Sequence, residues 1–223
     1  IDFNNSNKKY RWTRDEQLSL TLKAGPPLGP PESVFSYSDA NYLLLTEVIE
    51  HLTGQPFYTA MRNLLKYNDL NIKNTWFPTL EERPANTKPL AHQYWETYKW
   101  DTYDLDVSVD LYGGGGIAAT TRDLAVFIHQ LFNYKIVTDT TVFNQIFTEV
   151  STKSAERSYY GLGISFYEYR AMKAYGHGGF WGTRVLYFPE INTSIAIYIL
   201  ERDQRKLTND IIRGLLDRLK EKR

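Results

Sequence analysis

The sequence predicts an α+β fold in which an antiparallel sheet is flanked by helices. Apolar residues recur at helical spacing before residue 150, whereas short strand-like runs separated by turns fill the chain beyond residue 158. One amphipathic helix then closes the chain. Helices first, antiparallel strands second and a single helix last is an order typical of α+β proteins. We expect residues 1–223 to form a single domain, with a helical subregion at about 36–150 and the sheet with its terminal helix at about 158–222.

The first expected elements are an irregular segment and two helices. Residues 1–35 are expected to be irregular because the run AGPPLGPPES holds four prolines and two glycines in ten residues. A helix is expected from about residue 41 to 53, ended by Gly54. Its apolar residues share one face: Leu44, Leu45, Val48, Ile49 and Leu52. A second helix is expected over residues 57–65, with an inward face made of Met61, Leu64 and Leu65.

The middle of the chain combines a long loop with two further helices. Residues 70–112 are rich in Trp, Tyr, Pro and Asp, and loops of this length are usually functional or packed over a cleft. Thr120, followed by Asp123, forms a capping-box pattern that predicts the start of a helix. The apolar face of this helix is Leu124, Phe127, Ile128 and Leu131. Another helix is expected at about 139–150.

The last part of the chain changes to the period of strands. The runs YYGLGISFYEY, KAYGHGG, TRVLYFPE and TSIAIYIL predict short strands, and PEIN between the last two predicts a hairpin turn. The terminal helix is expected from about residue 206 to 220. Its apolar residues form one stripe suited to packing on a sheet: Leu207, Ile211, Ile212, Leu215, Leu216 and Leu219.

Composition argues against several classes of function. Lysine plus arginine equals aspartate plus glutamate at 26 each, so no basic surface points to nucleic acid or to an anionic membrane. No apolar run reaches transmembrane length, and the absence of cysteine excludes disulfides and thiolate metal sites. No two histidines have metal-ligand spacing, so we expect no metal, and nothing indicates a cofactor. The abundant aromatic residues indicate a core and a well-furnished cleft, with a sugar-stacking surface as the alternative.

Two short segments contain side chains suited to proton transfer. Tyr37 and Asp39 precede a helix, where a phenol beside a carboxylate could move protons. The alternative is that Ser38 or Asp39 caps the helix and Tyr37 packs on its first turn. His177 ends a strand and is followed by Gly178 and Gly179, which would expose the imidazole and backbone N–H groups at a cleft edge.

The remaining candidates have simpler interpretations. His51, His92 and His129 are expected to be structural. The glycine run at 113–116 permits close approach of the backbone to a ligand or to another strand. It lacks the Lys-Ser/Thr ending of a phosphate-binding loop, so nucleotide binding is not expected.

Taken together, these segments resemble the serine β-lactamase and penicillin-binding superfamily, in the class C β-lactamase-like branch of esterases, D-peptidases and amide hydrolases. Tyr37-Ser38-Asp39 occupies the place of the family's Tyr-x-Asn motif. GGGGIAATTRDLAVFI is similar to its Gly-Gly and Thr-x-x-Asp-Leu helix entry, and His177-Gly178-Gly179 falls where the family has Lys-Thr-Gly or His-x-Gly. The resemblance spans roughly residues 29–200 and implies a β-lactamase/transpeptidase-like fold.

The resemblance also implies roles for individual residues. Tyr37 would be the general base and acid, and Asp39 would position the catalytic lysine and the substrate amide. His177 would hydrogen-bond the tyrosine oxygen or a substrate carboxylate, which requires Tyr37 and His177 to face one cleft. The backbone N–H of Phe180 would be an oxyanion donor, next to Gly178 and Gly179 on an open strand edge. Asp39 in place of asparagine and His177 in place of lysine favour an esterase or peptidase-like member over a strong β-lactamase.

The nucleophile of this family is a serine in a Ser-x-x-Lys motif that begins a buried helix. The only such pattern here, Ser6 to Lys9, has polar neighbours and stands 31 residues before Tyr37. We therefore expect an N-terminally truncated chain, the C-terminal two-thirds of a serine hydrolase, with the nucleophile outside it. The missing part would leave Leu207, Ile211 and Leu215 less covered, a surface that favours association.

The expected function is that of part of a serine acyl hydrolase. It would act on an ester, amide or β-lactam through an acyl-enzyme, with a small-molecule or peptide-like acyl substrate. The resemblance implies a periplasmic or other extracytoplasmic location. Two alternatives stay open: a non-catalytic ligand-binding member or fragment of the same fold, and an unrelated aromatic-rich binding module.

Overall fold

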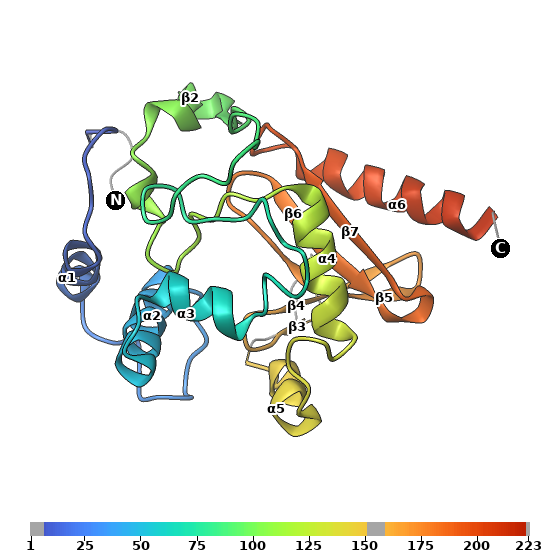
Figure 1. The fold of residues 1–223 in the computed structure, drawn as a ribbon, viewed down its shortest axis with the longest axis horizontal. Helices are drawn as coiled ribbons and strands as arrows, with labels where there is room; N and C mark the ends of the chain where they lie inside the picture. The colour runs from blue at the N-terminus through green and yellow to red at the C-terminus, as the bar shows by residue number, and fades with distance from the viewer. Residues whose placement is uncertain (1–6, 151–158, 222–223) are drawn as a thin grey trace. The chain divides into compact units, whose positions relative to one another are not determined.

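The computed structural model describes residues 7–150 and 159–221 and divides into two compact units. The first unit comprises Ile1–Leu90 and Asp101–Ala119, and the second comprises Ala91–Trp100 and Thr120–Arg223. Figure 1 shows the helices of the first unit and the sheet of the second.

Three helices build most of the first unit: α1 (Arg14–Ala24), α2 (Asp39–Thr53) and α3 (Phe57–Leu64). The expectation that residues 1–35 are irregular was wrong for α1. This helix buries none of its residues, so it has no apolar stripe by which the sequence could reveal it. It is held by polar contacts: Thr13 and Glu16 form a capping box, and Arg14 reaches Glu50 at 2.6 Å.

Helices α2 and α3 match the predicted ranges, but the predicted faces are only partly correct: Ile49 and Met61 pack against the core, whereas most of the other expected residues do not. Leu44, Leu45, Val48 and Leu52 of α2 are 50–77% exposed, whereas Leu43 and Thr46 are buried. In α3 the expected inward residue Leu64 is 60% exposed, and Phe57 and Ala60 are buried instead. The small core of this unit forms around Phe57, Phe77 and Leu111. Periodicity located these helices correctly, but it could not determine which side would find a partner.

The long segment after α3 is mostly irregular, as its composition predicts. It contains two short paired strands, β1 (Tyr94–Trp95) and β2 (Trp100–Asp101). Short 3₁₀ helices interrupt it at Glu96–Tyr98, Thr102–Asp104 and Val107–Val109. The last of these leads into the glycine run.

The second unit contains a five-stranded antiparallel sheet in the order β3-β4-β5-β6-β7. The strands are β3 (Tyr159–Tyr160), β4 (Ser165–Tyr169), β5 (Met172–Gly178), β6 (Thr183–Phe188) and β7 (Thr193–Tyr198). Strands that are neighbours in the sheet are also consecutive in the sequence, and short connections join them. One connection is the predicted PEIN turn, in which Asn192 adopts a left-handed conformation. The predicted α+β class and the antiparallel sheet are confirmed.

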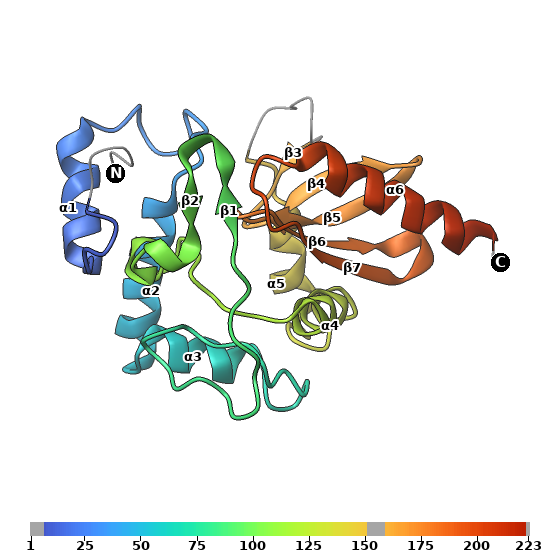
Figure 2. The same cartoon turned by 90° about the horizontal axis from the view of Figure 1, so that it is seen from above.

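Helices cover both faces of this sheet. Figure 2 shows α6 (Arg205–Glu221) on one face and α4 (Thr121–Phe132) on the other. Thr120 caps α4 by accepting a hydrogen bond from the Asp123 backbone N–H at 3.1 Å, as the capping-box pattern predicts. The helix expected at 139–150 is shorter, with α5 at Thr140–Asn144 and a 3₁₀ turn at Gln145–Phe147.

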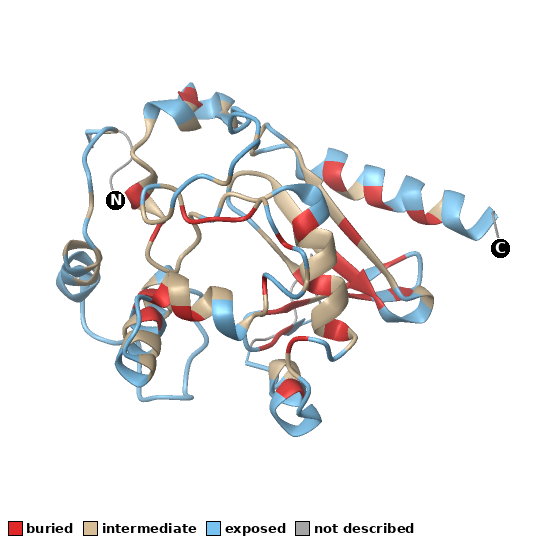
Figure 3. Ribbon diagram, in the orientation of Figure 1, coloured by how far each residue is buried: buried red, intermediate tan, exposed pale blue. Residues whose placement is uncertain are grey.

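Only part of the apolar stripe of α6 lies on the sheet. Ile212 and Leu216 are fully buried in a cluster with sheet residues such as Ala174 and Leu186. Leu207, Ile211, Leu215 and Leu219 remain 36–46% exposed. Figure 3 shows this helix with buried residues on one side and exposed residues on the other. The prediction of a single stripe packed on the sheet was therefore wrong for four of its six residues. That a missing N-terminal part leaves Leu207, Ile211 and Leu215 less covered stays a prediction.

Candidate active site

Tyr37 and Asp39 lie at the start of α2, on either side of the residue that caps it. Ser38 is the N-cap, because its hydroxyl accepts a hydrogen bond from the Ala40 backbone N–H at 3.3 Å. The cap that the sequence left open between Ser38 and Asp39 is thus Ser38. The Tyr37 ring is 45% exposed, so solvent reaches it beside the positive end of the helix dipole.

The glycine run packs against two aspartates, the exposed Asp39 and the partly buried Asp110. A Cβ atom on Gly114 would lie 3.0 Å from Asp39 Cβ and 3.1 Å from Asp110 Oδ1. One on Gly115 would lie 2.5 Å from Asp110 Oδ2. The glycine run therefore permits close approach, as expected, and what it approaches is this pair of aspartates.

These surroundings change the pKa of both carboxyl groups. Burial, assisted by the negative charge of Asp39, raises the pKa of Asp110 to about 7, although the backbone N–H of Gly116 opposes the shift. Burial also raises the pKa of Asp39, even though part of this residue is exposed. A carboxyl group with a pKa near 7 can hold or release a proton at physiological pH, which makes Asp110 a candidate proton carrier near the start of α2.

Replacing Asp110 by asparagine should change how stability depends on pH. Because the pKa of Asp110 is raised from 3.8 to about 7 in the folded chain, the folded state binds more protons than the unfolded state between those values, and stability falls as pH rises. Between pH 5 and pH 8, wild type should lose on the order of 2–4 kcal/mol of its free energy of unfolding through Asp110. We expect Asp110→Asn to lack this loss and to be more stable than wild type at pH 8. Denaturant titrations at pH 5 and pH 8 measure this.

Asp106→Asn is the matched control for that experiment. Asp106 lies in the same unit, and hydrogen bonds from Ser108 together with Arg11 hold its pKa below the usual range. Replacing Asp106 should destabilise the protein at pH 8, whereas replacing Asp110 should stabilise it. Equal pH dependence in Asp110→Asn and wild type would contradict the assignment of Asp110.

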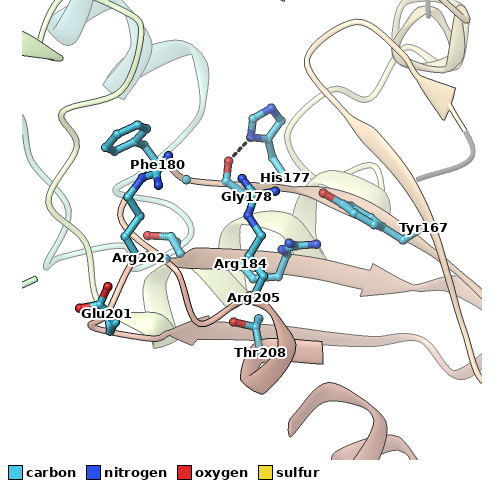
Figure 4. A pocket seen from close by; sticks show the side chains of 12 residues that line it. Tyr167, His177, Gly178, Phe180, Arg184, Glu201, Arg202, Arg205 and Thr208 are labelled. Carbon is cyan, nitrogen blue, oxygen red and sulfur yellow. Dashed lines mark hydrogen bonds between the residues drawn. The ribbon is translucent and has the colours of Figure 1, made fainter. Parts of the chain in front are cut away.

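His177, Gly178, Gly179 and Phe180 lie together in the second unit, where β5 ends. They line part of a cavity of about 150 Å³ that also has Tyr167, Arg184, Arg202 and Arg205 in its wall. Figure 4 shows this cavity, with the imidazole of His177 pointing away from Arg184 and Arg205. The alternation of the sheet explains this, because His177 pairs with Val185, and the next residue, Arg184, points to the opposite face.

Both ring nitrogens of His177 have partners within this unit. Nδ1 is 2.8 Å from the carbonyl oxygen of Gly178, and Nε2 is 3.1 Å from the hydroxyl of the buried Tyr160. A carbonyl oxygen only accepts, so Nδ1 carries the proton, and in the neutral ring Nε2 accepts from Tyr160. The expectation that His177 contacts Tyr37 or a substrate carboxylate concerns groups outside this unit. Tyr37 lies in the other unit, so their approach stays a prediction.

This geometry predicts the tautomer of His177. Neutral His177 should have its proton on Nδ1, and Tyr160→Phe should shift the population toward Nε2–H because the donor to Nε2 is lost. Long-range ¹H–¹⁵N correlation spectra of the ring nitrogens measure both states. His51, on α2, serves as the reference within the same sample. An Nε2–H tautomer in the unmodified protein would contradict the assignment.

The model of the Beta-lactamase family matches residues 2–212. The chain belongs to this β-lactamase family. Membership excludes the alternative of an unrelated aromatic-rich binding module, and it agrees with the order in which Tyr37, the glycine run and His177 occur.

Three proteins similar to this chain are named as hydrolases. An N-acetylmuramyl-L-alanine amidase of Bacillus subtilis is 26% identical over 86% of this chain and 50% of its own length. A teichoic acid D-alanine hydrolase of Staphylococcus aureus is 29% identical over 78% of this chain and 43% of its own length. The structure of a D-amino acid amidase from Ochrobactrum anthropi superposes with a TM-score of 0.79, at 20% identity, over 99% of this chain and 68% of that chain. The chain thus spans about half the length of the curated relatives it matches.

Sequence reasoning missed several residues of the site. Asp110 directly precedes the glycine run, but nothing local connects it to Asp39. Tyr160 was assigned only to a strand. No sequence motif surrounds the three arginines, which lie near the start of β6 or α6 or between β7 and α6: Arg184, Arg205 and Arg202. Within residues 7–150 and 159–221, no cluster of acidic and histidine side chains could hold a metal ion, and no helix has the length and apolarity to cross a bilayer.

The Ser6–Lys9 motif is only partly visible. Ser6 lies outside the described residues. Lys9, which would have to activate it, donates from Nζ to the carbonyl oxygen of Tyr103 at 2.5 Å. A lysine held by a distant carbonyl is a poor general base for the serine three residues before it.

Proposed function

We propose that this chain is part of a serine acyl hydrolase that works through an acyl-enzyme, with the nucleophile outside the 223 residues. The observation that carries the proposal is the match of the β-lactamase family model over residues 2–212, with hydrolases among the relatives. The weak context of Ser6 and the engagement of Lys9 with Tyr103 support a nucleophile elsewhere.

In the first unit, Tyr37 would act as general base and acid. Its phenol is exposed at the start of α2, where the helix dipole favours the phenolate that must form during proton transfer. Asp39 would orient the nucleophile's lysine and the substrate amide. Asp110 would support Asp39: because its pKa is raised to about 7, a proton held by Asp110 would limit the negative charge beside Asp39.

In the second unit, the end of β5 would bind the reacting carbonyl. The backbone N–H of Phe180 would donate to the developing oxyanion, and Gly178 and Gly179 would leave the strand edge open to the substrate. His177 would not contact the carbonyl itself; its ring contacts Tyr160 and the Gly178 carbonyl oxygen. Through these two contacts it would position the end of β5 that carries the oxyanion donor.

The substrates to test first are D-alanyl esters and D-amino acid amides. Two proteins similar to this chain, a teichoic acid D-alanine hydrolase and a D-amino acid amidase, are named for these groups. Asp39, a charged acceptor where the family has an amide, disfavours β-lactams that rely on an amide donor at this place.

Labelling with a fluorophosphonate separates the alternatives. We expect no covalent adduct on the 223-residue chain, and an adduct on an upstream serine in a longer protein that joins this chain to a Ser-x-x-Lys helix. Intact-mass and peptide mass spectrometry locate the adduct, and Ser6→Ala controls for labelling within this chain. An adduct at Ser6 with turnover would overturn the external nucleophile. A longer protein that binds a D-amino acid amide without forming any adduct would instead be the non-catalytic member.

A further inference from the structure

We propose that the cavity at the N-terminal end of α6 binds a phosphate group. Arg184 is the principal ligand, and Thr183 and the arginines at positions 202 and 205 complete the wall. This proposal concerns only the second unit and does not depend on acyl transfer.

The cavity wall carries an excess of positive charge. Three arginines line it against one glutamate, Glu201. The Glu201 carboxylate is directed to the backbone, where it accepts from the N–H groups of Glu96 and Asp203 at 3.3 and 3.4 Å. One arginine, Arg202, is neutralised by Asp203 at 2.6 Å, but Asp203 is not part of the wall. The first turn of α6 begins at Arg205 and adds the positive end of a 17-residue helix.

Arg184 is the charge that this arrangement leaves without a counterion. Among the described residues, its contacts are the face of Tyr167 at 4.8 Å and the hydroxyl of Tyr169 at 3.4 Å, and its Nε is buried without a hydrogen-bond acceptor. This partly buried guanidinium meets aromatic groups, and no described carboxylate forms an ion pair with it. Its free energy falls when an anion supplies the missing partner.

The arginines are also preorganised. Arg202 is held 4.1 Å from the rings of both Trp95 and Phe180, and Arg184 lies over Tyr167. Stacking on aromatic faces fixes the plane of a guanidinium while leaving its N–H edges for a ligand. Because less side-chain entropy remains to be lost, binding costs less.

The donor set fits phosphate better than carboxylate. Arg184 and Thr183 belong to β6, Arg205 to α6, and Arg202 to the segment between β7 and α6, so cations approach from three elements (Figure 4). A tetrahedral group presents oxygens to several sides and can accept from a guanidinium fork and a hydroxyl at once, whereas a planar carboxylate is satisfied by one fork. The volume of about 150 Å³ admits such a group.

Calorimetric titration tests the proposal at constant ionic strength. Inorganic phosphate, dimethyl phosphate and acetate are titrated separately into the protein. We expect saturable phosphate binding with a Kd on the order of 1 mM and acetate at least tenfold weaker. Binding of dimethyl phosphate as tightly as phosphate would assign the site to phosphodiesters, and weaker binding of the diester would assign it to free phosphate or monoesters.

Arg184→Met should weaken phosphate binding at least tenfold, and Arg184→Lys should fall in between because it keeps the charge but loses the fork. Arg170→Met is the matched control, since Arg170 pairs with Asp217 on the surface of the same unit, and it should bind within twofold of wild type. If Arg184→Met fails to fold, Arg184→Lys carries the test. The proposal would be overturned if phosphate binding did not saturate or if acetate bound as tightly as phosphate. It would also be overturned if the folded Arg184 variants bound phosphate with wild-type affinity.

Discussion

Replacing Tyr37 by phenylalanine should lower kcat for acyl transfer by about 10²–10⁴-fold in the protein that contains the nucleophile, because proton transfer by a positioned side chain contributes a factor of this size. The fold should persist, since the ring is 45% exposed and the change removes one hydroxyl. Ester hydrolysis and the rate of acyl-enzyme formation measure the effect. Both steps should slow, because the same phenol transfers the proton in each.

Tyr134→Phe is the control for this experiment. Tyr134 is 44% exposed, almost the same as Tyr37, but it lies after α4, where its ring packs against Phe143. This variant should retain activity within twofold. If Tyr37→Phe were equally active, Tyr37 would have no part in the chemistry, and the proposed function would have to rest on another base.

Replacing Gly176 by alanine should destabilise the second unit by about 3 kcal/mol or more. Gly176 lies inside β5, between Ser165 of β4 and Leu186 of β6. A Cβ atom there would lie 1.9 Å from the carbonyl oxygen of Val185. This oxygen belongs to the backbone and cannot rotate away as a side chain would, so strands β5 and β6 must separate. Denaturant unfolding followed by circular dichroism measures the loss.

Gly214→Ala should instead stabilise the second unit. Gly214 lies within α6, and a Cβ atom there would meet no atom within 4 Å. Alanine restricts the unfolded chain and favours the helix, so we expect a gain of about 0.5–1 kcal/mol. A Gly176→Ala variant within 0.5 kcal/mol of wild type would contradict the described packing of β5 against β6.

Local sequence patterns predicted much of the second unit. Thr120 and Asp123 predicted where α4 begins, and PEIN predicted the turn between β6 and β7, because capping and turn chemistry involve residues that are neighbours in sequence. The order of Tyr37, the glycine run and His177 was sufficient to predict the β-lactamase family, since each motif is read without knowing what it contacts.

Local patterns failed where burial depends on distant partners. The same periodicity that located α2 left most of its apolar face exposed, and α1, with no buried residue, is held by Arg14 on Glu50. Two of the six residues of the α6 stripe are buried by the sheet and four are exposed. Periodicity records that a helix has an apolar side, but only the neighbouring elements determine which part of that side loses its water.

By itself, the sequence determined the family, the α+β class and the residue types available for chemistry. Only the tertiary structure determined how those groups are charged and oriented. It placed Asp110 beside Asp39 and against the glycine run, where burial raises the pKa of Asp110 to about 7, and it placed the His177 ring against Tyr160. It also left Arg184 over Tyr167 without a described carboxylate partner. A pKa, a tautomer and an uncompensated charge each depend on the groups that folding brings within a few ångströms, and spacing along a chain does not specify that distance.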